Sequence, residues 1–453
     1  MIVPQNRLLW WFALIALPFS VLTAVYPEAF LVGMTLIGGL VVAATADALK
    51  AYGRSDDLKL ELPEVVRLSK DRAGEIEARL KNERTKARRI RVGLALPREI
   101  QTPAEEQMIP LPSGNDWSRI KWPCTSVKRG HYRLSKVYWE EASPFGLWAR
   151  RGTLPVNCQV RVYPNLSAER KGLAALFLRR GTFGLHTHRQ IGKGREFEKL
   201  REYVPGDSTE DIHWKATARR GHPITKVFQI ERTQEVYVIV DASRLSARRE
   251  SATDRGLRTA DSRSSDTALE RFVTAALILG LAAEQQGDLF GLITFADQVG
   301  TFLRARNGQA HYHACRDALY TLEPQSTTPD FDEIATFIRL RLRRRALLVF
   351  LTALDDPVLA EGFVRNMDLL CRQHLVLVNM LKPCGADPLF TNSGVSSVDD
   401  LYRQLGGHLQ WHNLRELEKV LQRRGVHFSL LDREEMSAQL VSEYLNVKQR
   451  QLL

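Results

Sequence analysis

The chain has 453 residues, more than a single hydrophobic core usually holds, so two or three domains are expected. Its 64 Lys and Arg outnumber its 52 Asp and Glu, and the net charge of +12 favours an anionic partner such as lipid headgroups or nucleic acid. The cysteines are scattered and lack CxxC spacing, which argues against a disulfide framework or a zinc site and predicts buried thiols in a reducing compartment. They are Cys124, Cys158, Cys315, Cys371 and Cys384.

Two apolar runs begin the chain. Leu8 to Val25 and Phe30 to Ala46 carry no charged residue, and the short link Tyr26 to Ala29 separates them. Each run is close to the length of a helix that crosses the hydrocarbon core of a bilayer. We therefore expect a transmembrane helical hairpin over residues 1–54. A cleaved signal peptide for the first run, or buried core helices for both, are the alternatives.

The flanking charges predict the orientation of this hairpin. Arg7 precedes the first run, Lys50 and Arg54 follow the second, and the link between the runs has no Lys or Arg. The positive-inside rule then places both ends of the hairpin, and the bulk of the chain, in the cytoplasm.

Residues 55–165 alternate apolar and polar positions in short runs separated by Pro and Gly, which predicts an antiparallel β-sandwich without catalytic function. The segment from Lys128 to Trp148 and the run Val160 to Asn165 are rich in aromatic residues. We expect these rings to fill the sandwich core and its corner turns rather than to form a binding site. The alternating apolar positions are Ile76, Ala78, Leu80, Ile90, Val92, Leu94, Leu96, Val160 and Val162.

Residues 166–232 contain the densest motif of the chain, GREFEKLREYVPGDSTEDIHWKATAR, from Gly194 to Arg219. Asp207 to Glu210 has the spacing of a capping box and predicts a short helix carrying Trp214. The glycines lack the GK[ST] ending of a phosphate loop. Aromatic residues among alternating charges indicate partly buried ion pairs, so this segment is predicted to be a rigid connector with a buried Trp214.

Residues 233–453 alternate continuous apolar strands with amphipathic helices. This pattern predicts a mostly parallel, doubly wound sheet covered on both faces. Ligands of such sheets bind at the carboxyl ends of the strands. The residues at that edge are expected to be Asp241, Ser243, Asp297 and Asp355.

The whole chain, and the motif above all, resembles the domain-of-unknown-function family 58 of bacterial membrane proteins. The signature G-x-E-F-x-x-L-R-x-Y-x-x-G-D, then I-x-W-x-x-(S/T)-A-R and a later E-R, is carried by a set of spaced residues. They are Gly194, Glu196, Phe197, Leu200, Arg201, Tyr203, Gly206, Asp207, Ile212, Trp214, Thr217, Ala218, Arg219, Glu231 and Arg232. The chain departs from the family at Glu210, where Arg is more usual.

This resemblance implies a membrane hairpin, a β-sandwich, the signature segment and a von Willebrand factor A-like domain, in a protein of the bacterial inner membrane. It also implies a partner, a MoxR-type AAA+ ATPase, with which the chain would assemble or activate other proteins. The expected function is that of a membrane-anchored, non-enzymatic adaptor. The alternative is a scaffold for cell-envelope assembly that needs no ATPase.

A von Willebrand A-like domain would also imply Mg²⁺ at an Asp-x-Ser-x-Ser site completed by a Thr and an Asp. Asp241 and Ser243 fit its first two places, and Thr327 or Thr328 could supply the threonine. Leu245 occupies the third place and Ala353 stands where an aspartate is expected. The alternative is that Asp241 and Ser243 only cap backbone amides.

Other motifs give weaker signals. His186 and His188 lie on one loop but lack further ligands at metal-binding spacing. The basic, Ser-rich stretch from Ser243 to Asp266 predicts either a solvated insertion or a segment that orders on an acidic partner or lipid phosphate. No GxSxG or HExxH motif and no nucleic-acid-binding motif is present, so neither an enzyme, a nucleic-acid partner nor a small-molecule substrate is expected.

Overall fold

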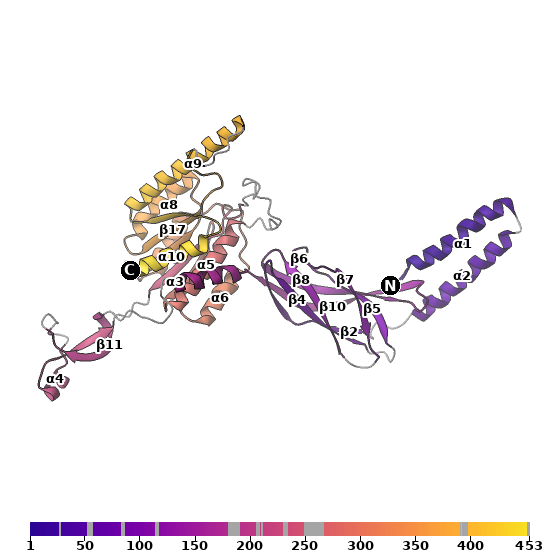
Figure 1. Ribbon diagram of the computed structural model, residues 1–453, viewed down its shortest axis with the longest axis horizontal. Helices are drawn as coiled ribbons and strands as arrows, with labels where there is room; N and C mark the ends of the chain where they lie inside the picture. Colours follow the sequence, from indigo (N-terminus) through magenta and orange to yellow (C-terminus); the bar gives the residue numbers. More distant parts are fainter. Residues whose placement is uncertain are drawn as a thin grey trace. The chain divides into compact units, whose positions relative to one another are not determined.

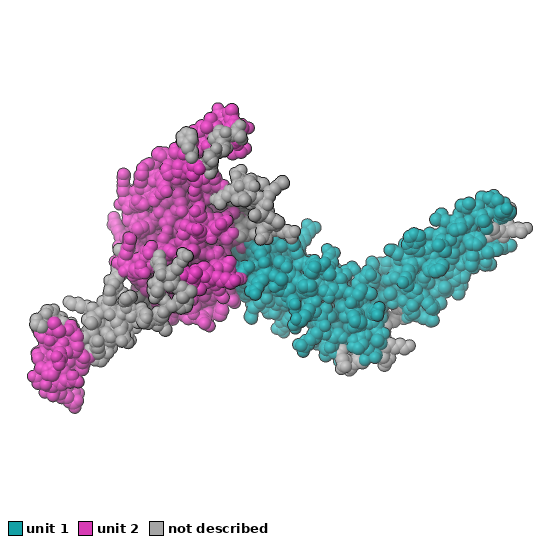
Figure 2. All heavy atoms as spheres, viewed as in Figure 1, with its two compact units in different colours: residues 1–165 teal, residues 166–453 magenta. Residues whose placement is uncertain are grey.

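A computed structural model of the chain describes residues 1–26, 29–51, 58–82, 87–113, 117–179, 191–204, 209, 212–229, 234–248, 267–389, 391 and 397–450. It combines helices and sheets in two compact units, Met1–Asn165 and Leu166–Leu453 (Figure 2).

The first unit begins with two apolar helices, α1 (Asn6–Val25) and α2 (Ala29–Ala51), which lie side by side (Figure 1). A Cβ atom on Gly33 of α2 would lie 3.1 Å from Cβ of Phe19, so the helices pack closely at this point. By length and composition, residues Phe30–Lys50 can cross a membrane, and the apolar part of α1 is shorter. The segment is close to the N-terminus, and most of its side chains are exposed to the surroundings.

The rest of the first unit consists of two sheets. One has the strand order β1-β10-β9-β5-β7, with β3 paired parallel to β10, and the other has the order β2-β4-β8-β6, antiparallel throughout. Apolar side chains at alternate positions point into one shared core, as the period-two pattern predicts. The strands are β1 (Ile2–Pro4), β2 (Leu58–Glu61), β3 (Val65–Ser69), β4 (Ala73–Asn82), β5 (Arg88–Leu94), β6 (Ile100–Gln101), β7 (Glu106–Leu111), β8 (Trp117–Ser126), β9 (Gly130–Ala142) and β10 (Trp148–Tyr163).

The aromatic residues of this unit divide between the core and the surface. Trp122 and Trp139 are buried in the core, whereas Tyr138 and Phe145 are exposed. The expectation that the rings between Lys128 and Trp148 fill the core and its corners is therefore wrong for Tyr138 and Phe145. Tyr138 lies on β9, where alternate side chains point to opposite faces, and Phe145 lies in the turn after this strand.

The second unit is built on a six-stranded sheet of order β15-β14-β13-β16-β17-β18. All neighbours are parallel except the edge strand β15, which is antiparallel to β14. This is the mostly parallel sheet that the alternating pattern predicts, with an antiparallel edge that it did not predict. The strands are β13 (Glu235–Asp241), β14 (Leu289–Phe295), β15 (Val299–Arg306), β16 (Leu347–Leu351), β17 (Leu375–Leu381) and β18 (His427–Leu431).

Helices cover both faces of this sheet. Val236, Val238 and Val240 of β13 pack in one cluster with α3, α5, α6 and α10, while Tyr237 and Ile239 pack in a second with α7, α8 and α9. The helices are α3 (Ser167–Arg179), α5 (Ala268–Gln285), α6 (Gln309–Leu319), α7 (Phe331–Arg341), α8 (Pro357–Leu370), α9 (Val398–Arg423) and α10 (Met436–Gln449).

Two helices differ from the sequence-based expectation. Leu173 and Phe177 of α3 are buried in the first of these clusters, so the start of the predicted connector belongs to the α/β core instead. Helix α9 begins at Val398, where Ser397 and Asp400 form a capping box, although the apolar periodicity of the sequence predicts a helix only near Leu414 to Arg423.

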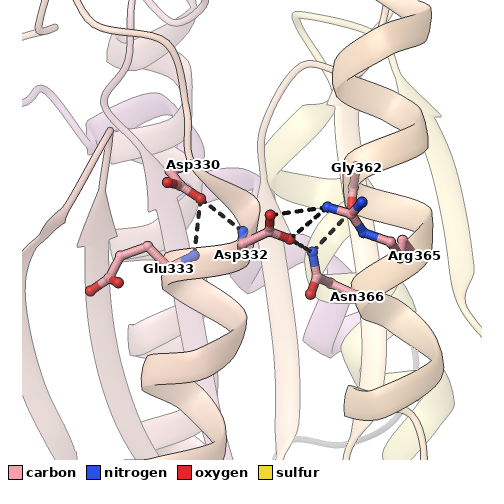
Figure 3. A network of polar contacts seen from close by, with 6 residues as sticks. All are labelled: Asp330, Asp332, Glu333, Gly362, Arg365 and Asn366. Atoms are coloured by element: carbon pink, nitrogen blue, oxygen red, sulfur yellow. Dashed lines mark hydrogen bonds and ion pairs between the residues drawn. The ribbon is translucent and has the colours of Figure 1, made fainter.

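A polar network joins α7 to α8 on the second face of the sheet (Figure 3). Asp330 caps α7 by accepting hydrogen bonds from the backbone N–H groups of Asp332 and Glu333 at 2.9 and 3.0 Å. Arg365 and Asn366 of α8 donate to the Asp332 carboxylate, and these hydrogen bonds hold its pKa below the usual value. The network fixes the two helices relative to each other.

The cysteines are free thiols. Cys124, Cys158 and Cys315 are buried as predicted, and burial raises the pKa of Cys124 to about 11 and that of Cys315 to about 12. Cys371 is only partly buried and Cys384 is exposed, so for these two the expectation of buried thiols is wrong.

Candidate functional site at the carboxyl edge of the parallel sheet

The candidate site lies where β13, β14 and β16 end. These strands are neighbours, and β13 separates the half of the sheet that continues through β14 from the half that continues through β16. The connection after β13 leads to β14 on one side and the connection after β16 leads to β17 on the other, which is the arrangement that opens a ligand-binding crevice in α/β sheets.

Asp241 is the last residue of β13 and its side chain is completely buried, with 0% exposed. One carboxylate oxygen, Oδ1, accepts the backbone N–H of Ser243 at 2.8 Å, and the other, Oδ2, accepts the hydroxyl of Thr352 at 2.6 Å. Burial raises the pKa of Asp241, although the hydrogen bonds from Thr352 and Ser243 oppose this effect. The carboxylate thus ties the end of β13 to the residue that follows β16.

Ser243 is also completely buried and continues the same cap. Its Oγ accepts the backbone N–H of Leu245 at 3.3 Å, and its carbonyl accepts the hydroxyl of Ser246 at 2.8 Å. Because Asp and Ser side chains satisfy the N–H groups two residues further on, the segment forms a closed turn.

The rim of the site comes from the loop before α7. The N–H of Gln325 donates to the carbonyl of Ala242 at 2.7 Å, and the N–H of Arg244 donates to the carbonyl of Thr327 at 2.9 Å. The hydroxyl of Thr327 donates to Asp297 at 3.3 Å. Thr327 rather than Thr328 therefore faces this edge, since Thr328 is exposed and the hydroxyl on Asp241 is that of Thr352.

Arg248 and Asp355 form an ion pair beside this turn. The Arg248 side chain is half exposed, whereas Asp355 is largely buried and its second oxygen, Oδ1, has no hydrogen-bond partner among the described residues. Asn379, paired in register with Leu351 and Ser429, is completely buried, and neither its amide oxygen nor its amide nitrogen has such a partner within the described parts of the chain. Buried polar atoms are usually satisfied, so Asp355 and Asn379 retain hydrogen-bonding capacity at this edge, as do some other buried side chains among the described residues, such as His374.

The donor set does not fit a tightly held divalent cation. Both oxygens of Asp241 already accept hydrogen bonds, and the apolar residues Leu245 and Ala353 occupy two positions that would supply oxygen ligands. Over the described ranges, no group of three or more His, Cys, Asp and Glu side chains is placed to hold a metal ion. His186 and His188 lie outside the described residues.

The signature segment is described in part. Its backbone forms a two-stranded sheet, β11 (Ile191–Glu202) with β12 (Ile224–Gln229), and the short helix α4 (Trp214–Arg220) between them. The ring of His213 caps α4 by accepting the N–H of Ala216 at 3.1 Å. The side chains of Glu196 and Phe197, and residues Gly206, Asp207, Glu231 and Arg232, lie outside the description, as does most of the predicted capping box. The backbone of Gly194 lies in β11.

The described signature residues correct the prediction of a buried joint. Trp214 is 69% exposed and Leu200 is also exposed. Arg201, Tyr203 and Ile212 are half-buried, and Arg219 is exposed. The exposed position follows from the brevity of α4, which has no buried residue of its own.

Sequence analysis missed several residues of the site. Thr352 and Asn379 belong to no motif, and the pairing of separate strands brings Thr352 to Asp241 and Asn379 beside Leu351. Arg248 lies in the basic stretch from Ser243 to Asp266, but its pairing with Asp355 was not predicted, and residues 249–266 lie outside the described residues. A polar residue within the buried strand HLVLVNML was the available signal for Asn379.

Comparison with known proteins gives a family match over part of the chain. The model for "Protein of unknown function DUF58" matches residues 199–401. The proteins Rv1480 of Mycobacterium tuberculosis and Mb1516 of Mycobacterium bovis are each 26% identical to this chain over 195 residues, 42% of this chain and 56% of the relative. The chain thus spans about half the length of the curated relatives it matches.

Solved structures give weak likenesses. An aerotolerance-related membrane protein from Bacteroides fragilis is 15% identical, with a TM-score of 0.29, over 48% of this chain and 100% of that one. The PilB minor pilin from Streptococcus sanguinis is 8% identical, with a TM-score of 0.30, over 90% of this chain and 96% of that one. TM-scores of this size do not establish a shared fold.

Proposed function

We propose that the chain is a member of the DUF58 family and acts as a membrane-anchored, non-enzymatic adaptor that binds partner proteins through the carboxyl edge of its parallel sheet. The match over residues 199–401 supports the family, and the apolar helix Phe30–Lys50 supports attachment to a membrane. The expected partner is a MoxR-type AAA+ ATPase, which would supply the energy for assembling or activating other proteins.

In this proposal α1 and α2 form a two-span hairpin in the bacterial inner membrane. Their apolar side chains are largely exposed, which suits contact with lipid. Arg7 before the first span and Lys50 after the second favour a cytoplasmic location for both ends, and so for both units.

The α/β unit is proposed to be von Willebrand A-like. Its strand order, its single antiparallel edge strand and the Asp-x-Ser turn after the central strand support this assignment. The proposed unit works without a tightly held cation, because its donor set does not suit one.

The single observation that carries the adaptor proposal is the state of the polar groups at the sheet edge. Arg248 offers a half-exposed guanidinium, and its partner Asp355 retains a buried oxygen without a hydrogen bond among the residues described. A partner that presents a carboxylate to Arg248 would release Asp355 to find another donor. Arg pairs with carboxylates in bidentate geometry, which makes it suited to this exchange.

The test is affinity purification of the full chain from mildly solubilised membranes. One sample contains Mg²⁺ and a non-hydrolysable ATP analogue, the other contains EDTA, and mass spectrometry quantifies the co-purified proteins. The adaptor proposal predicts a stoichiometric AAA+ ATPase only in the nucleotide sample. Envelope-assembly proteins in equal amounts under both conditions would instead support a scaffold that needs no ATPase.

Two variants locate the contact. Arg248→Ala removes the guanidinium at the sheet edge, and recovery of the ATPase is expected to fall. Arg424→Ala is the matched control, because Arg424 also pairs with an aspartate, Asp368, on the same unit but away from this edge. Equal recovery with both variants would place the partner elsewhere.

A further inference from the structure

A turn of the first unit, residues 143–148, contacts the ends of both N-terminal helices. Asp47, near the end of α2, is completely buried, and its hydrogen bonds within the described part of the chain all come from this turn. Its Oδ1 accepts the N–H of Phe145 at 3.1 Å, and its Oδ2 accepts the N–H of Leu147 at 3.2 Å and the hydroxyl of Ser143. A carboxylate at the end of an apolar helix is thereby satisfied by three donors.

The same turn fixes the start of α1. The N–H of Gln5 donates to the carbonyl of Leu147 at 2.9 Å. Gly146 has a φ of +71°, in the left-handed region that favours glycine, and a Cβ atom there would lie 3.1 Å from Nη1 of Arg7. On the α2 side, Nε1 of Trp148 donates to the carbonyl of Ala44 at 2.8 Å. The start of α1 and the end of α2 therefore lie at one level, beside the turn.

The side chains exposed at this level are aromatic and basic. Trp10 and Trp11 are exposed on the first turns of α1, and Phe145 is 56% exposed at the tip of the turn. The ammonium group of Lys50 lies over the Phe145 ring, 5.2 Å from its centroid, and Arg7 is exposed beside Gly146. Amphipathic aromatic rings and cationic side chains are the residues that occupy the boundary between hydrocarbon and headgroups.

We propose that this collar, defined as residues 143–148 with Arg7, Trp10, Trp11 and Lys50, binds the interface of the lipid bilayer that holds the helices. Arg7 and Lys50 contact lipid phosphates, and Phe145 enters the upper acyl region beside the two tryptophans. Asp47 is a positioning residue, because its hydrogen bonds hold the turn at the level of the helix ends. The proposal rests on the proposed membrane anchoring and adds a lipid-binding surface on the β-sandwich unit.

The surface fits a bilayer better than a protein groove. The collar directly continues the apolar helix Phe30–Lys50, so a membrane that contains this helix brings headgroups to the collar at high effective concentration. Its cations complement anionic headgroups, which attract basic residues close to the membrane surface.

The experiment measures the depth of a fluorophore at Phe145. Full-length chain with Cys371→Ser and Cys384→Ser carries Phe145→Cys labelled with an environment-sensitive dye, and is reconstituted into phosphatidylcholine vesicles with or without phosphatidylglycerol. Lipids with a spin label high or low on the acyl chain quench the dye according to its depth. Lys128→Cys is the control, since Lys128 is exposed and precedes β9, whose other end leads into the collar.

If the collar binds the bilayer, the dye at position 145 is expected to shift its emission to the blue when the chain is in vesicles. The shallow spin label should quench this emission strongly and the deep spin label less strongly. The dye at position 128 should show neither the shift nor the quenching. If the chain floats with the vesicles but the dye is unquenched at both positions, the collar proposal would be overturned and the membrane anchoring would stand. Chain that fails to float would overturn both.

Two further variants test the roles of the charged residues. With the dye at 145, Asp47→Ala is expected to reduce shallow quenching, whereas Thr45→Ala is not, because the Thr45 hydroxyl bonds only the carbonyl of Val42 in its own helix. Arg7→Gln with Lys50→Gln is expected to abolish any gain in quenching from phosphatidylglycerol. Unchanged shallow quenching in Asp47→Ala would overturn the positioning role of Asp47. If phosphatidylglycerol increases quenching in the Arg7→Gln, Lys50→Gln variant as much as in the parent chain, the phosphate contacts would be overturned.

Discussion

Asp47 in the first unit and Asp241 in the second are completely buried aspartates whose oxygens all accept hydrogen bonds, and the surroundings of the two differ. Asp47 receives three hydrogen bonds from a single six-residue turn, whose own backbone closes through the 2.8 Å bond from the Ser143 N–H to the Trp148 carbonyl. Asp241 receives two, from elements far apart in sequence, and the nearby Asp355 and Asn379 keep buried polar atoms without a partner among the described residues.

The two buried carboxylates therefore suit two different roles, a structural joint at Asp47 and support of a binding edge at Asp241. At Asp47 the carboxylate accepts three hydrogen bonds from one local turn, which suits a permanent joint. At Asp241 the carboxylate secures a sheet edge whose neighbouring groups are incompletely satisfied, which suits a surface that completes its hydrogen bonds with a partner. Changes at the two aspartates should therefore have different consequences.

The largest effect is expected for Asp47→Ala. The substitution leaves the Ser143 hydroxyl and the N–H groups of Phe145 and Leu147 without their acceptor, and buried unsatisfied groups cost about 1–3 kcal/mol each. Thermal unfolding in detergent and limited proteolysis at the turn should both show the loss. Thr45→Ala serves as the control, and equal stability of the two variants would contradict the role of Asp47 as a joint.

A smaller loss, about 2 kcal/mol, is expected for Asp241→Ala, which removes two hydrogen bonds. Asp241→Asn keeps the shape and one acceptor oxygen, and should lose less. Chemical denaturation of the full chain in detergent compares the two variants. A loss in Asp241→Asn as large as in Asp241→Ala would mean that the negative charge itself is required.

The pH dependence of Asp241 has a defined sign. Burial raises its pKa in the folded state, so its protonated form is favoured there. Its contribution is most stabilising below the ordinary value of 3.8 and weakens as the pH rises from that value through the raised pKa. The Asp241→Asn variant should lack this part of the pH dependence, and identical profiles for variant and wild type would contradict the assignment.

Trp214→Ala is expected to change stability by no more than about 0.5 kcal/mol, because the ring is exposed and surface substitutions have effects of this size. Trp214→Ala should therefore lose less stability than Asp241→Ala, whereas a buried tryptophan would make it lose more. Melting curves of Trp214→Ala and Asp241→Ala show which substitution lowers stability more. A larger loss for Trp214→Ala would mean that Trp214 is buried in a joint after all.

The smallest effect is expected at the junction of α7 and α8. Arg365 and Asn366 hold the pKa of Asp332 below 3.8, so the stabilisation is present above pH 3.8 and is lost as the pH falls below it. Asp332→Asn should therefore narrow the stability difference between neutral and acidic pH by a small amount. The exposed position of Asp332 limits the effect through solvent screening.

The regular periodicities predicted much of the fold. The alternating strands of the first unit and the continuous apolar strands from Glu235 to Leu431 appear where their patterns place them, because burial of one or both faces dictates the period. The antiparallel strand β15 was missed, and α3 was assigned to the wrong part of the chain. Nothing in a local pattern states which core an isolated amphipathic helix will join.

The candidate site was predicted only where a strand end marks it. Asp241 and Ser243 follow directly from the end of β13, but Thr352 reaches Asp241 through the pairing of β13 with β16. Asp47 was the first charge after an apolar run, and its position gave no sign of the turn, about one hundred residues away, that donates hydrogen bonds to it. Trp214 was wrongly predicted to be buried, because a tryptophan surrounded by charged residues in the sequence can lie either in a core or on a surface.

Hydrogen–deuterium exchange on the full chain, alone and in the complex recovered with nucleotide, shows whether partners bind at the carboxyl edge of the parallel sheet. We expect slower exchange on partner binding in residues 242–248 and 352–356, with residues 143–148 unchanged in the same detergent. Equal exchange of both edge segments in the free and bound samples would contradict the claim that partners bind at the carboxyl edge of the sheet.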